Sequence, residues 1–88
     1  MGTGDRQWAD AFALFERGEF SAARAAFEAT LLEHETAAAH ENLCHLSMAL
    51  EDLEAAKRHG ERAYRMYREA GNAKRAAAAA LMIAQAYM

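Results

Sequence analysis

The sequence lacks proline and valine, and its only isoleucine is Ile83. Valine and isoleucine favour strands, and no segment alternates apolar and polar residues with the period of two that a half-buried strand requires. The residues that dominate instead are alanine, leucine, glutamate, arginine and lysine, which favour helices. The sequence therefore predicts an all-α protein.

Cysteine and long apolar runs are also scarce. The single cysteine, Cys44, cannot form a disulfide within the chain, which suits a reducing compartment. The longest apolar stretch, residues 76–84, is far shorter than the ~20 residues that a membrane-spanning helix needs. The N-terminus lacks a basic region followed by an apolar core. We therefore expect a cytoplasmic protein that does not enter a membrane.

Neither sign of charge dominates, because 10 basic and 13 acidic side chains give a net charge of −3. The charges are interspersed along the chain, so we expect no extended cationic surface and no direct binding of nucleic acid. The sequence also lacks a glycine-rich phosphate loop after a strand and a nucleophile paired with a base. We expect neither catalysis nor a cofactor.

One pair of residues has the spacing of metal ligands. His40 and Cys44 lie four residues apart and would share one face of a helix, with His45 adjacent. A closed zinc site needs four protein ligands, and no further ligand motif is present. We therefore expect no metal and interpret Cys44 as a buried thiol.

Capping residues and glycines divide the chain into five helical segments. Gly18 and Gly71 suit the left-handed position that follows a helix. Residues that favour the N-cap stand at the start of four of the segments: Asp5, Thr36, Asp52 and Asn72. The helices are predicted over about 5–18, 20–34, 37–51, 53–70 and from 73 onward.

An internal repeat joins these segments in pairs. Residues 18–27, which contain Gly18, Phe20, Ala23 and Phe27, align with residues 51–60 at a separation of 33 residues. The first copy resembles the tetratricopeptide signature, in which glycine, an aromatic residue, alanine and a second aromatic residue follow in this order. A period near 34 is typical of that class of helical hairpins. The second copy is degenerate, with glutamate for the glycine and Gly60 for the second aromatic residue, and neither copy has the closing proline.

Residues 61–72, with Ala76 and Ala77 further on, are similar to tetratricopeptide regions of bacterial LuxR-type helix-turn-helix regulators and related signalling proteins. The resemblance covers roughly residues 18–80. It implies a short solenoid of antiparallel helical hairpins, with repeat 1 at about 5–35 and repeat 2 at about 36–70. Residues 72–88 would then be the first helix of a third repeat or a capping helix. It also implies a sensing or scaffolding segment and identifies no catalytic residue.

First helices of tetratricopeptide hairpins line a concave groove that binds partner peptides. The resemblance thus gives seven candidate groove residues: Trp8, Phe12, Phe15, Glu41, His45, Met48 and Gln85. The alternative is that the three aromatic residues of the first helix pack on Leu31 and Leu43, because aromatic stripes at helical spacing are usually core. Both interpretations remain open from the sequence.

The last helix carries more apolar side chains than one packing face can use. A second copy of the chain could cover the surplus, and the candidate self-association residues are Leu81, Ile83, Tyr87 and Met88. The expected function is a non-catalytic module that binds a protein or peptide. The alternatives are a helical small-molecule sensor and a homodimerisation module.

Overall fold

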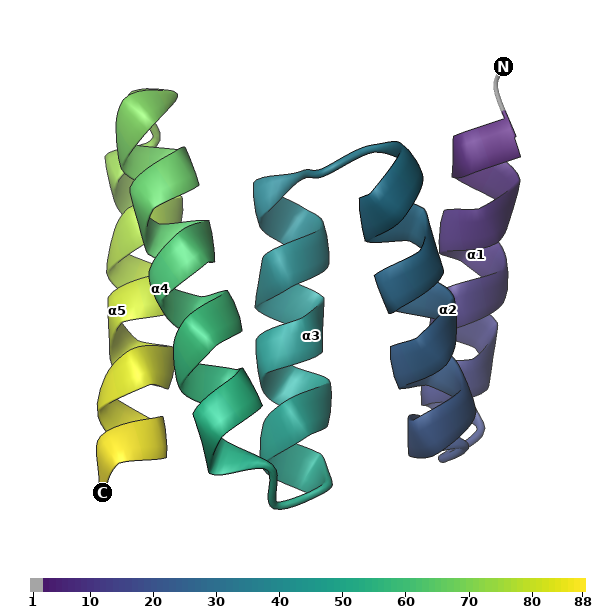
Figure 1. The fold of residues 1–88 in the computed structure, drawn as a ribbon. Coiled ribbons are helices and arrows are strands. Elements are labelled where there is room, and N and C mark those ends of the chain that lie inside the picture. Colours follow the sequence, from purple (N-terminus) through teal and green to yellow (C-terminus); the bar gives the residue numbers. More distant parts are fainter. Residues whose placement is uncertain (1–2) are drawn as a thin grey trace.

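The computed structural model describes residues 3–88, with side chains from Ala9 onward. Its helices are α1 (Thr3–Glu16), α2 (Phe20–Glu33), α3 (Ala37–Ala49), α4 (Leu53–Glu69) and α5 (Ala73–Tyr87). Consecutive helices run in opposite directions (Figure 1). The described residues form five helices and no strand, which confirms the all-α prediction. Each of these helices is too short or too polar to cross a lipid bilayer.

The predicted N-caps of the last three helices are confirmed. Thr36, Asp52 and Asn72 each accept a hydrogen bond from the backbone N–H three residues later, at 3.0, 3.2 and 3.1 Å. These bonds satisfy donors that the first turn of a helix leaves free. The first helix differs, because it begins at Thr3 and the prediction that Asp5 caps it is wrong.

Three of the connections repeat one backbone geometry. Gly18, Glu51 and Gly71 have φ angles of 79°, 60° and 77°. The residue after each one donates its N–H to the carbonyl oxygen five residues earlier, at 3.0, 2.8 and 2.9 Å. This is the Schellman arrangement, which ends a helix with one left-handed residue. Glycine adopts that conformation without steric strain, whereas a glutamate does not.

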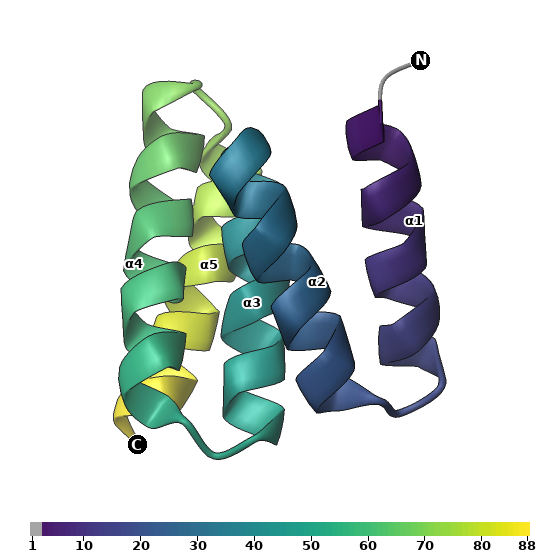
Figure 2. The same ribbon diagram turned by 45° about the vertical axis from the view of Figure 1, so that its right-hand side comes forward.

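Each helix packs mainly on its neighbours in the sequence. The interfaces of α3 with α4 and of α4 with α5 are the most extensive. Helices α2 and α3 share a smaller interface than the other consecutive pairs, and α3 touches α5 over a short stretch. In both ribbon views α4 lies directly against α5, while α1 lies at the other end of the row (Figures 1 and 2).

Two apolar clusters lie on different sides of α3. The first joins α1, α2 and α3, and its buried members are Ala11, Ala23, Phe27, Leu43 and Leu46. The second joins α3, α4 and α5, and its buried members are Cys44, Ala56, Met82 and Ala86. Helix α3 therefore contributes buried residues to both clusters. Large side chains fill the first cluster, whereas small side chains dominate the second and let its helices approach closely.

Gly60 marks the closest of these approaches. It is buried in α4, and a Cβ atom at this position would lie 2.9 Å from Ile83 Cγ1 and 3.3 Å from Cys44 Sγ. Both distances are tighter than ordinary van der Waals contact. The absence of a side chain at Gly60 is thus what allows α3 and α5 to pack against the same turn of α4.

Candidate functional site

The residues predicted to line a groove fall into two groups in the structure. Glu41, His45 and Met48 are spaced by four and three residues, so they share one side of α3. His45 is exposed, Met48 is half-buried against the second cluster, and Gln85 is exposed on α5. These four residues come from α3 and α5, two helices that touch over a short stretch.

The aromatic residues of α1 have a different environment. Phe12 packs edge-on against Phe27, with ring centroids 5.7 Å apart and an interplanar angle of 79°. Phe15 packs against Phe20 at the same centroid distance. Both are partly buried beside the first apolar cluster, which favours the core interpretation for these two residues. The side chain of Trp8 lies outside the described residues.

The Glu41 carboxylate links three helices through hydrogen bonds. The Tyr67 hydroxyl donates a hydrogen bond to Glu41 Oε1 at 2.7 Å, and the Arg75 guanidinium donates to both carboxylate oxygens. Burial and the bond to Glu41 raise the pKa of Tyr67, and the same carboxylate raises the pKa of Arg75. With its side chain only 12% exposed, Glu41 holds α3, α4 and α5 together and leaves few oxygen lone pairs for a ligand.

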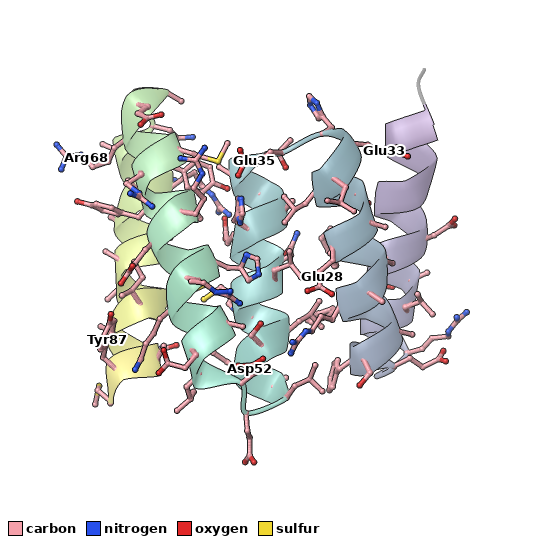
Figure 3. The ribbon with its side chains drawn as sticks, in the orientation of Figure 1. Glu28, Glu33, Glu35, Asp52, Arg68 and Tyr87 are labelled. Carbon is pink, nitrogen blue, oxygen red and sulfur yellow. The ribbon has the colours of Figure 1, made fainter. Side chains whose placement is uncertain are left out.

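A second polar network, which the sequence interpretation missed, lies between α3 and α4. Nδ1 of His40 is 2.9 Å from Nδ1 of His59, and Nε2 of His40 is 2.7 Å from Glu35 Oε2. The Arg62 guanidinium donates one bond to each oxygen of Glu35, both at 3.1 Å. Glu35 belongs to the connection that precedes α3, at the end of the stack opposite Asp52 (Figure 3).

Two pKa shifts follow from this geometry. The hydrogen bonds from Arg62 and His40 lower the pKa of Glu35 to about 2. Burial, followed by the nearby charge of His40, lowers the pKa of His59 to about 4. Glu35 is therefore an anion and His59 a neutral imidazole at neutral pH. No clear signal for this pair was present in the sequence, because His40 lies ten residues before the turn at residues 50–52 and His59 only seven residues after it.

The structure does not bring His40 and Cys44 together as a metal site. The ring nitrogens of His40 face Glu35 and His59, and Cys44 is fully buried. Burial also raises the pKa of the Cys44 thiol, which opposes formation of a thiolate ligand. Within the part of the chain that the structure describes, no three His, Cys, Asp or Glu residues form a group that could hold a metal ion.

A nucleophile for covalent chemistry is equally hard to assign. The Ser47 hydroxyl is buried and has no hydrogen-bond partner, so no base is positioned to activate it. The raised pKa of Cys44 keeps that thiol protonated. The geometry of these two side chains suits packing, not acyl transfer.

The candidate self-association residues also separate. Leu81 is 69% exposed and Met88 is fully exposed. Tyr87 is exposed but donates a hydrogen bond to Glu61 at 2.8 Å. Ile83 instead faces Gly60 of α4 and is half-buried, which argues against a role for Ile83 in self-association.

Comparisons of the chain with models of protein families, with curated proteins and with solved structures found no match.

Proposed function

We propose that the chain is a non-catalytic tetratricopeptide-like module that binds a protein or peptide segment. Three observations support the repeat: the recurrence at 33 residues, the antiparallel hairpins, and the left-handed turn residues Gly18 and Glu51 at equivalent positions. On the resemblance of residues 18–80, we further propose that the module belongs to a bacterial regulatory or scaffolding protein of the cytoplasm.

The open side of α3 is the observation that carries the binding role. Helix α3 is central in the row, and its Leu43 and Cys44 sides are covered by the two apolar clusters. Its remaining side presents His45 and Ala49, which are exposed, and Gln85 of α5 lies on the adjoining helix. A polar, uncovered surface on the innermost helix of a stack is the kind of surface that repeat proteins use for binding.

The chemistry of this side fits an extended peptide. The imidazole of His45 and the carboxamide of Gln85 can both donate and accept hydrogen bonds, which matches a peptide backbone. Met48, half-buried on the same side of α3 as His45, adds an adaptable apolar contact. Since Glu41 is already bonded by Tyr67 and Arg75, we assign it to positioning the helices, not to contacting the peptide.

A peptide-display experiment tests this function. A random peptide library is selected on the immobilised chain, and enriched peptides are measured against the double variant His45→Ala/Gln85→Ala. We expect binding to weaken about tenfold or more, which corresponds to ~1.4 kcal/mol. The matched control is His34→Ala, an exposed histidine of the connection between α2 and α3, which should leave binding unchanged. Failure to enrich any peptide, or equal binding by both variants, would refute the assignment.

One further observation favours self-association as a second candidate function. Ala77, Leu81, Ala84 and Met88 recur at spacings of four, three and four residues along α5, and all four are exposed. They form one apolar stripe on a helix that the described chain covers on its other side. A second copy of the chain that buried this stripe would remove apolar surface from water.

A further inference from the structure

We propose that the contact between His40 and His59 is a proton-operated latch between α3 and α4, which stays closed while at least one imidazole is neutral and opens when both are cationic. The two Nδ1 atoms face each other at 2.9 Å, and the ring centroids lie 5.1 Å apart. Only one hydrogen fits between nitrogens at this distance.

The neutral pair has one arrangement of its hydrogens that satisfies every contact. Glu35 can only accept a bond, so the hydrogen of His40 sits on Nε2, and Nδ1 of His40 becomes an acceptor. The hydrogen between the rings must then come from Nδ1 of His59. His59 is thus the Nδ1–H tautomer, and its Nε2 faces away from the contact.

The first added proton reverses the bond without breaking it. In the arrangement that keeps the bond, the positive charge lies on the ring whose Nε2–H points at the Glu35 carboxylate, which Arg62 fixes in place. Nδ1–H of His40 now donates to His59, and His59 becomes the Nε2–H tautomer while remaining neutral. The contact therefore tolerates one positive charge and one change of tautomer.

The second proton cannot be accommodated. It would place a hydrogen on both Nδ1 atoms, so two donors and two positive charges would face each other at 2.9 Å. The other charged groups around His59 are Arg58 of its own helix, Arg24 of α2 and Asp52 of the turn before α4. The two cations outnumber the one carboxylate, so the surroundings add to the repulsion.

The sign of the pH dependence follows from the His59 pKa of about 4. A histidine of the unfolded chain titrates near 6.5, so between about pH 4 and 6.5 the unfolded chain binds more protons than the folded one. The contribution of His59 to stability is complete above this window and is lost as the pH falls through it. The carboxylate of Glu35 stays charged until about pH 2 and holds His40 throughout.

Opening the latch alters more than one side chain. Glu35 lies between α2 and α3, and its bonds to His40 and Arg62 tie that connection to α4. When His59 leaves His40, α4 loses this contact with α3, while the bonds of Glu35 to Arg62 and of Glu41 to Tyr67 still join the two helices. Acidification would thus loosen the packing of α4 on α3, the helix that carries most of the proposed peptide surface.

Urea unfolding as a function of pH tests the latch. We expect the titration of His59 to raise the unfolding equilibrium constant of the chain about 10- to 40-fold between pH 6.5 and 4.5. His59→Gln, which cannot titrate, should lose that increment, and the matched control His45→Gln, an exposed histidine of α3, should keep it. Parallel pH profiles for the chain and His59→Gln would overturn the proposal.

Nitrogen NMR of the imidazoles keeps the test decisive if His59→Gln does not fold. In the unaltered chain we expect His59 to change from the Nδ1–H to the Nε2–H tautomer when the pair takes up its first proton, and to become cationic only near pH 4. A His59 ring that becomes cationic in one step, without an intervening change of tautomer, would contradict the latch. This outcome leaves the peptide-binding function untouched, because His45 and Gln85 lie on another side of the stack.

Discussion

Glu51 is the residue that departs furthest from its local preference. It has a φ of 60°, and it is the one non-glycine residue with positive φ in the described part of the chain. The left-handed conformation destabilises an L-residue by roughly 1–2 kcal/mol relative to glycine, whose greater freedom in the unfolded chain offsets part of the gain. The equivalent position in the first hairpin is Gly18.

We therefore expect Glu51→Gly to raise the free energy of unfolding by about 1 kcal/mol, measured by urea denaturation. Glu51→Ala removes the same carboxylate but keeps the strained backbone, so it separates the conformational effect from the charge. The conformational explanation fails if alanine stabilises the chain as much as glycine does.

At the scale of elements, the packing of α5 on α4 depends on Gly60. An alanine there favours the helix by about 1 kcal/mol in an open environment, but its Cβ would lie 2.9 Å from Ile83 Cγ1. Overpacking of this kind destabilises by about 1–3 kcal/mol, so steric repulsion outweighs helix propensity. We expect Gly60→Ala to lower the midpoint of thermal unfolding.

The same substitution should reverse its effect in the background of Ile83→Ala, which removes the clashing Cγ1 atom. The double-mutant cycle measures the coupling directly, and contacting residues usually give 0.5–3 kcal/mol. Additive effects of the two substitutions would show that α5 moves away from Gly60 without resistance, contrary to the packing described above.

The elements themselves could be predicted because their signals are local. An N-cap such as Asp52 accepts a hydrogen bond from an N–H only three residues away, so its role can be predicted without knowledge of the tertiary structure. The pairing of His40 with His59 depends on the register of α3 against α4, which packing sets across nineteen residues of chain. The same limit explains why the sequence left open whether Phe12 faces a groove or the core.

At the scale of the whole molecule, exposed apolar surface is concentrated on α5. We expect the chain to self-associate through the Ala77 to Met88 stripe, and Leu81→Glu to shift it towards the monomer in analytical ultracentrifugation. Leu32→Glu is the matched control, because Leu32 is 90% exposed on α2, outside this stripe. If both variants or neither variant change the sedimentation of the chain, the stripe is not a specific interface.

Charge is also unevenly distributed over the molecule, which corrects our first interpretation of the sequence. Of the 13 acidic residues, ten precede Leu53, and of the 10 basic residues, seven follow it. Two ion pairs join the acidic part of the chain to the basic part, Glu35 with Arg62 and Glu41 with Arg75. The asymmetry thus contributes to holding α4 and α5 against the first residues of α3 and the connection before it.

The position of α3 between the two apolar clusters affects how the stack can bend. The contact of α2 with α3 is the smallest among consecutive helices, whereas the bonds of Glu41 to Tyr67 and Arg75 join α3, α4 and α5. We therefore expect the stack to be most compliant between α2 and α3. A load applied across the stack should bend it there, and the bond of Arg24 to Asp52 should be among the first to carry the strain.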